Sequence, residues 1–170
     1  MIKEILTYPT NKDILLQKSE DIKIEDITNE ETQQLIQDLK DTLNNSTGVG
    51  ISAVQIGELK RICIIKHNKK EYVIINPKVT KQRGSILSDE GCLSAPNTYT
   101  KTLRAQKIWF DYYDETGRKR TADEGGLFSI IAQHEFDHFD GGCVVFTQVD
   151  KNDQLATQIA EHIKKEKSNE

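Results

Sequence analysis

The residues best suited to chemistry in this sequence are two histidines and a glutamate within the stretch Gln133-His134-Glu135-Phe136-Asp137-His138. Residues four apart share one face of an α-helix, so His134 and His138 can bind the same metal ion. Glu135 lies beside them and can transfer protons without binding the metal. Two histidines do not complete a coordination sphere, so the chain must supply a third protein ligand.

Core histidines on an apolar helix are the alternative interpretation of this pair, and for a lone histidine it would be preferred. The His-Glu-x-x-His pattern is much more specific. The run from Leu127 to Phe139 is apolar, and a buried helix has no other reason to carry three polar groups so close together. The pattern therefore favours a metal site.

Two downstream positions are candidates for the third ligand, and neither fits well. The metzincin arrangement requires a histidine six residues after His138, but that position is Val144. A glutamate on a following helix, as in gluzincins, would have to be Glu161. Glu161 lies on the charged side of the terminal segment, where a solvated side chain is expected.

Cys92 is the better candidate for the third ligand. It lies in the glycine-flanked stretch Glu90-Gly91-Cys92-Leu93-Ser94, away from any apolar run. Cys63 and Cys143 lie among Ile and Val, which is typical of small core residues. A thiolate at Cys92 with two imidazoles would hold a divalent metal and leave one position open to water.

The composition limits the class of protein. The chain of 170 residues fits one domain spanning residues 1–170, with 36% hydrophobic and 29% charged residues. The net charge of −4 disfavours DNA as a partner. No apolar run reaches the roughly 18 residues of a membrane span. Three widely spaced cysteines predict no disulfide framework, so we expect a cytoplasmic protein, or one in an organelle matrix after a transit peptide is trimmed.

The elements that must position these residues follow from apolar periodicity. We predict helices over residues 10–18, 32–45, 124–139 and 152–167, and strands over residues 61–66, 71–76, 79–87, 107–113, 118–121 and 144–146. Pro77 should end the strand 71–76 because proline lacks the N–H that a ladder needs. The predicted fold is α+β: antiparallel β-sheets wrapped around a central buried helix that carries His-Glu-x-x-His, followed by a C-terminal amphipathic helix with Leu155, Ile159 and Ile163 on its inner side.

Three ordered motifs, taken together, resemble the peptide deformylase family: Gly48-Val49-Gly50-Ile51-Ser52-Ala53-Val54-Gln55, then Glu90-Gly91-Cys92-Leu93-Ser94, then Gln133-His134-Glu135-Phe136-Asp137-His138. The similarity spans most of the chain. Ser52 departs from the alanine that is usual in the family, a nearly isosteric change. The resemblance implies a metal-dependent hydrolase that removes the N-formyl group from the formyl-methionine of newly made peptides and releases formate.

The resemblance also implies roles for individual residues. Glu135 would act as general base and then as general acid. The side-chain amide of Gln55 and the backbone N–H of Leu93 would stabilise the oxyanion. Gln55 taken alone would be interpreted as an ordinary surface glutamine.

A methionine pocket is expected on the metal-binding face of the helix. Its residues are close to His134 in helix spacing or belong to the first motif: Val49, Gly50, Leu127, Ile130 and Ile131. They could equally be core residues, and both roles are compatible. We further hypothesise that Arg104 pairs with Glu90 and braces the cysteine loop.

The cofactor is expected to be one divalent metal ion. Thiolate plus imidazole accepts iron(II), zinc, nickel or cobalt, and the family resemblance favours iron(II). N-formylmethionyl nascent peptides are the expected partners, with no DNA and no membrane. Ribosome association through the basic cluster 164–167 is an alternative to a solvated helix end.

Two other functions remain open at this stage. A zinc endopeptidase with Glu161 as ligand would keep its metal in Cys92→Ala and would cut internal peptide bonds. A deformylase-like domain retained only for binding would release no formate.

Overall fold

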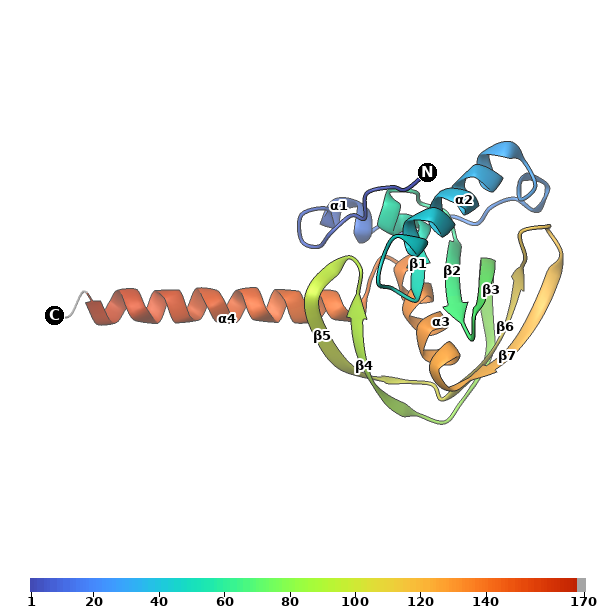
Figure 1. The fold of residues 1–170 in the computed structure, drawn as a ribbon. Coiled ribbons are helices and arrows are strands. Elements are labelled where there is room, and N and C mark those ends of the chain that lie inside the picture. The colour runs from blue at the N-terminus through green and yellow to red at the C-terminus, as the bar shows by residue number, and fades with distance from the viewer. Residues whose placement is uncertain (168–170) are drawn as a thin grey trace.

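Two antiparallel sheets and one central helix form the body of the molecule in the computed structural model (Figure 1). The structure describes residues 1–167, with side chains described for residues 1–155, 157 and 158. The five-stranded sheet has the order β1-β2-β3-β6-β7, and β4 and β5 form a two-stranded sheet. The strands are β1 (Gly50–Ser52), β2 (Ile62–His67), β3 (Lys70–Arg83), β4 (Ile86–Cys92), β5 (Ala95–Arg104), β6 (Lys107–Tyr113) and β7 (Lys119–Gly125).

The helices of the described residues are α1 (Lys12–Leu15), α2 (Glu30–Asn44), α3 (Gly126–Phe139) and α4 (Val144–Lys167), with short 3₁₀ turns η1 (Ile24–Asp26) and η2 (Ala53–Ile56). Three helices lie where the sequence predicts them: α1 corresponds to residues 10–18, α2 to 32–45 and α3 to 124–139. The boundaries of α2 and α3 agree closely with the prediction, whereas α1 is shorter than predicted at both ends. The predicted α+β class is confirmed.

The five-stranded sheet is covered by α2 on one face and α3 on the other. Along β2, Ile62 and Ile64 pack with the apolar side of α2, whereas Cys63 and Ile65 pack with α3. Successive side chains of a strand point to opposite faces, so a strand buried on both faces is apolar throughout. This double burial explains the continuous apolar run of β2.

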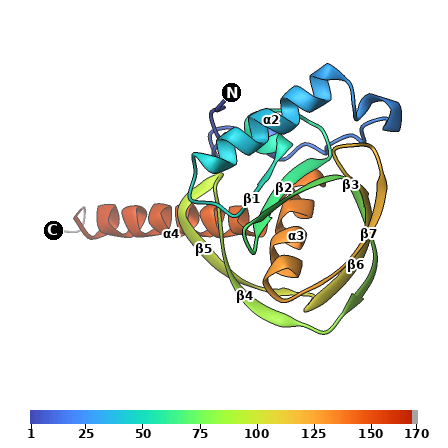
Figure 2. The same cartoon turned by 45° about the vertical axis from the view of Figure 1, so that its right-hand side comes forward.

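Helix α3 lies inside the curve of the strands, as Figure 2 shows. Phe128, Phe136 and Phe139 belong to the same core cluster as residues of β2, β3 and β6. Gly126 begins the helix with φ +59, a conformation that glycine adopts without strain. The burial of α3 fixes the orientation of the histidines that it carries.

Three strand predictions are wrong. The predicted strand 79–87 covers the end of β3 and the start of β4, which are separate strands with a break at Gly84 and Ser85. Pro77 does not end a strand: β3 continues through it to Arg83, and the register shifts between Ile75 and Lys78. At that shift β3 changes its neighbour from β2 to β6, so the missing N–H of proline costs no ladder hydrogen bond. The residues 144–146 form the first turn of α4 and not a strand.

Helix α4 projects away from the two sheets (Figure 1). Its first turn is buried through Val145 and Phe146, but Leu155 is 56% exposed. The predicted inner stripe of this helix is therefore wrong at Leu155, and the side chains of Ile159, Ile163 and the cluster 164–167 lie outside the described ones. Within the described residues, no helix is both long and apolar enough to cross a membrane.

Candidate active site

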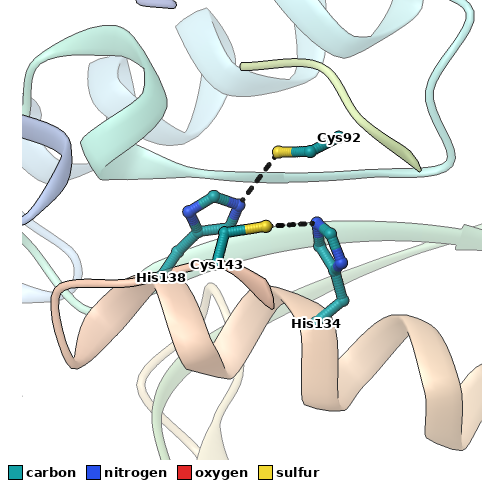
Figure 3. Close-up of side chains that lie close together, drawn as sticks. All are labelled: Cys92, His134, His138 and Cys143. Atoms are coloured by element: carbon teal, nitrogen blue, oxygen red, sulfur yellow. Dashed lines mark hydrogen bonds between the residues drawn. The ribbon is translucent and has the colours of Figure 1, made fainter. Parts of the chain in front are cut away.

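Four side chains with metal-binding atoms meet beside α3 (Figure 3). The ligand atoms of Cys92, His134, His138 and Cys143 all lie within 4.8 Å of one another. Cys92 Sγ lies 3.4 Å from His138 Nε2, and Cys143 Sγ lies 3.7 Å from His134 Nε2. The three predicted ligands are brought together, and a second cysteine joins them.

The four residues come from three places in the chain. His134 and His138 lie one turn apart on α3, Cys92 is the last residue of β4, and Cys143 lies in the short connection between α3 and α4. Soft thiolate and imidazole donors of this kind suit a transition-metal ion. The donor set therefore fits the divalent metal predicted from the sequence.

Cys143 was interpreted from the sequence as a core residue, and that interpretation is incomplete. It is 6% exposed and packs with Leu15, Val145 and Phe146, but its sulfur faces the cluster. Hydrogen bonding to Cys92 and to the two imidazoles lowers the pKa of the Cys143 thiol, and the same pairing raises the pKa of Cys92. The sulfur of Cys143 therefore lies close enough to the three predicted ligands to belong to the same cluster.

Glu90 holds His134 in the orientation that metal binding needs. The Nδ1 atom of His134 lies 2.8 Å from Glu90 Oε2, so Nδ1 carries the proton and the lone pair of Nε2 faces the cluster, where it can bind a metal ion. Arg104 donates two hydrogen bonds to Glu90, of 2.7 and 2.8 Å, and a third of 2.7 Å to Asp137. Burial alone would raise the pKa of Glu90, but hydrogen bonds from Arg104 and His134 outweigh it and lower that pKa.

Glu135 is buried beside the cluster and is held by a hydroxyl group. Ser52 Oγ donates a hydrogen bond of 2.7 Å to Glu135 Oε2 and lies 3.0 Å from the backbone oxygen of the same residue. Burial raises the pKa of the Glu135 carboxyl, against the effect of nearby His134 and His138. The replacement of the usual alanine by Ser52 is therefore a direct contact with Glu135, which the sequence did not reveal.

Gly50 makes room for Glu135. A Cβ atom at Gly50 would overlap Glu135 Oε1 and would lie 2.9 Å from its Cδ. Distances below about 3 Å do not occur between such atoms, so any other residue here would displace the carboxylate. Gly50 thus belongs to the site through its missing side chain.

The amide of Gln55 has a fixed orientation. Its Oε1 accepts a hydrogen bond of 2.8 Å from the backbone N–H of Ser52. Its Nε2 is therefore turned the other way and lies 3.6 Å from Cys92 Sγ and 3.1 Å from Ser94 Oγ. Gln55 is 1% exposed, so the interpretation as an ordinary surface glutamine is wrong.

A cleft of about 530 Å³ opens over these residues. It is lined on one side by residues of the first two motifs and on the other by α3, and all five residues of the expected methionine pocket take part: Val49, Gly50, Leu127, Ile130 and Ile131. Gln55, Glu90, Cys92, Leu93, His134 and Glu135 also line it. Val49 and Leu127 are 49% and 58% exposed at the mouth of the cleft, whereas Ile131 is buried.

The rival ligand Glu161 cannot be compared with Cys92 in the same way, because its side chain lies outside the described ones. Its backbone belongs to α4. The sequence offers only a weak signal for Cys143: it follows Gly141-Gly142 directly after the helix, but the direction of the chain after these glycines depends on tertiary contacts.

Comparison with known proteins agrees with the architecture of this site. Residues 2–155 match the family model described as polypeptide deformylase. A peptide deformylase of Thermodesulfovibrio yellowstonii is 36% identical over 145 residues, which are 82% of this chain and 85% of that protein. Peptide deformylase 2 of Clostridium acetobutylicum is 35% identical over 138 residues, covering 81% and 89%.

Solved structures show the same fold. The crystal structure of a peptide deformylase from Legionella pneumophila superposes with a TM-score of 0.79 at 29% identity, covering 92% of this chain and 98% of that chain. The chain belongs to the polypeptide deformylase family, the metal-dependent hydrolases that remove the N-formyl group from the formyl-methionine of newly made peptides and release formate.

Proposed function

We propose that Glu135, Gln55 and Leu93 carry out the deformylation, around a metal ion held by Cys92, His134 and His138. The observation that carries this proposal is the placement of the buried Glu135 carboxylate beside both histidines, in the wall of a cleft that can admit a peptide end. When bound, the metal supplies Lewis acidity, which makes a water molecule acidic enough to give up a proton near neutral pH.

Glu135 receives that proton and later delivers it to the leaving amine. The Ser52 hydroxyl holds Oε2, which leaves Oε1 on the side of Gly50. The carboxylate is therefore oriented before substrate binds, and burial in the cleft wall keeps bulk water from competing for the proton.

The charge that develops on the formyl oxygen needs hydrogen-bond donors. The Nε2 atom of Gln55 is the side-chain donor, since Ser52 fixes its amide the right way round. The backbone N–H of Leu93, the residue directly after Cys92, is the second donor, a role proposed from the family resemblance.

The methionine side chain would occupy the apolar end of the cleft. Val49, Leu127, Ile130 and Ile131 line this end, and burying an unbranched thioether against them is worth about 2 kcal/mol. Gly50 would let the peptide backbone approach closely.

The proposal also covers the extent of the domain, the cellular compartment and the identity of the metal. We place residues 1–170 in one catalytic domain that works in the cytoplasm on nascent peptides. With three protein ligands the metal would be iron(II), as favoured by the family, and zinc, nickel or cobalt would also bind thiolate and imidazole. Metal analysis of protein purified without oxygen distinguishes these ions.

The test is formate release from formyl-Met-Ala-Ser by the wild-type protein and by Glu135→Gln. Loss of general base and acid catalysis should lower kcat about 10²- to 10⁴-fold, while the metal content stays unchanged. Glu124→Gln, an acidic residue on β7 outside the cleft, is the matched control and should keep full activity. Activity that survives in Glu135→Gln would refute the role given to Glu135.

A further inference from the structure

Cys143 adds a second sulfur to the metal cluster, and the roles proposed above make no use of it. Its Sγ atom lies 3.7 Å from His134 Nε2 and within 4.8 Å of the ligand atoms of Cys92 and His138. Figure 3 shows the Cys143 sulfur pointing towards His134. A cysteine that served only to fill the core would not need this direction.

Two sulfur–nitrogen distances in the cluster are close to those of a tetrahedral site. With metal–sulfur and metal–nitrogen bonds of about 2.3 and 2.05 Å, a tetrahedral angle separates a sulfur from a nitrogen by about 3.6 Å. The two sulfur–nitrogen distances of 3.4 and 3.7 Å lie on either side of this value. We propose that Cys143 is a fourth protein ligand, which closes the coordination sphere of the resting protein; this inference rests on the proposed metal site of Cys92, His134 and His138.

The chain holds Cys143 firmly from the side of α3. Gly141 has φ +84, and a Cβ there would overlap the backbone oxygen of Leu16. The backbone N–H of Ser19 donates a hydrogen bond of 2.8 Å to the oxygen of Phe139. The reversal after α3 is thus packed against the segment that follows α1, and only glycine fits at its tightest point.

The following residues hold Cys143 from the side of α4. Val145 and Phe146 are buried, and the Phe146 ring stacks on Tyr8 with a centroid distance of 4.5 Å. The ring of His138 also meets Phe146 at 5.9 Å. Because both flanks are anchored, the thiol is preorganised where a fourth ligand is required.

A fourth protein ligand changes the character of the site. Two thiolates and two imidazoles are the donor set of closed, structural zinc sites, whereas catalytic sites keep a position for water. With Cys143 as a fourth ligand, zinc is therefore favoured over the iron(II) proposed for a site of three protein ligands. Hydrolysis would then require either a fifth coordination position or release of the Cys143 sulfur when substrate enters the cleft.

Counting the sulfur atoms around the metal tests this inference directly. Zinc-loaded wild-type protein should show two sulfur neighbours at about 2.3 Å in X-ray absorption spectra, with two nitrogens at about 2.0 Å. Cys143→Ala should show one sulfur. Cys63→Ala, which removes a buried cysteine of the core cluster under α3, is the matched control and should keep two.

The outcome does not depend on the variants folding, because one sulfur in the wild-type spectrum would overturn the inference by itself. Chelator competition gives a second measurement: Cys143→Ala should bind zinc at least about tenfold more weakly than the wild type and Cys63→Ala. Equal affinities in all three proteins would contradict a bond from Cys143. Failure of the proposed function would look different, since a protein inactive on formyl peptides could still show two sulfurs.

Discussion

At the scale of single residues, Arg104 supports the metal site without supplying a ligand. Its side chain is 9% exposed, and its guanidinium binds both oxygens of Glu90 and one of Asp137 on α3. Glu90 in turn orients His134. A buried bidentate pair of this kind acts by geometry as well as by charge, because the planar fork of arginine matches a carboxylate.

Removing this side chain should weaken the metal site without touching a ligand. We expect Arg104→Ala to raise the dissociation constant for zinc about 10- to 100-fold, and to lower the free energy of unfolding by about 3 kcal/mol because Glu90 stays buried without its partner. Arg104→Lys keeps the positive charge but cannot make the bidentate hydrogen bonds. Its zinc affinity and its stability should therefore lie between those of the wild type and of Arg104→Ala. Isothermal titration and urea unfolding measure the two effects.

The matched control is Lys101→Ala on the same strand. Lys101 is 68% exposed and its Nζ lies 3.7 Å from Asp89 Oδ1. The zinc dissociation constant and the free energy of unfolding of Lys101→Ala should therefore stay near their wild-type values. An unchanged zinc affinity in Arg104→Ala would show that Glu90 orients His134 without help.

At the scale of elements, the turn between β6 and β7 is organised by one carboxylate. Asp114 Oδ1 accepts hydrogen bonds from the backbone N–H groups of Thr116 and Arg118, at 3.0 and 3.1 Å, and its Oδ2 accepts one of 2.7 Å from Arg120. Gly117 completes the turn with φ +75. This hairpin leads directly into α3, so its geometry sets where the metal-binding helix begins.

Replacing this carboxylate should destabilise the protein in a pH-dependent way. Burial would raise the pKa of Asp114, but hydrogen bonds from Thr116 and Arg120 outweigh it and hold the pKa well below its usual range. A lowered pKa in the folded state stabilises the fold above the unfolded pKa of about 3.9, and this contribution is lost as the pH falls through the folded pKa.

We therefore expect Asp114→Ala to lower the free energy of unfolding by about 1–3 kcal/mol at pH 7. The difference from the wild type should shrink as the pH falls below about 4. Denaturant unfolding at several pH values measures it. Asp123→Ala on the same hairpin, whose carboxylate is 54% exposed and meets only Lys107, should change stability by less than about 0.5 kcal/mol. A pH-independent loss in Asp114→Ala would contradict the assigned cause.

How far these elements could be predicted from the sequence depended on burial. Strands β2 and β6 and helix α3 are buried and apolar, so their periodicity was informative. Strand β5 was not predicted, because only Ala95 in it is buried and its outward residues carry no apolar alternation. Pro77 was misjudged because the change of strand partner at that point is a property of the sheet and not of the local sequence.

The residues of the site likewise differ in how far the sequence could predict their positions. His134 and His138 are close in sequence, so helix spacing alone placed them together. The contact between Ser52 and Glu135 spans 83 residues, and the approach of Cys143 depends on the reversal at Gly141 against Leu16. Such tertiary contacts leave no local periodicity from which to predict them.

At the scale of the whole molecule, the metal cluster joins parts of the chain that belong to different elements. Cys92 belongs to the two-stranded sheet, the histidines to α3, and Cys143 to the start of the segment that continues as the projecting α4 (Figure 1). A ligand that binds only the folded state stabilises it by mass action. The metal should therefore act as a cross-link between the two-stranded sheet, the central helix α3 and the start of α4.

This cross-link predicts a dependence of thermal unfolding on metal concentration. Zinc at about 100 times its dissociation constant should add about 2.7 kcal/mol to the free energy of unfolding, which raises the Tm of a chain of this size by about 5–10 °C. A chelator should reverse the shift. In Cys92→Ala the shift should be smaller, because the only ligand contributed by the two-stranded sheet is gone, whereas Cys63→Ala should keep all of it. Magnesium, which prefers oxygen ligands, should leave the Tm of every variant unchanged. A zinc-dependent Tm in Cys92→Ala equal to that of the wild type would mean that the ion binds elsewhere and does not connect the two-stranded sheet to α3.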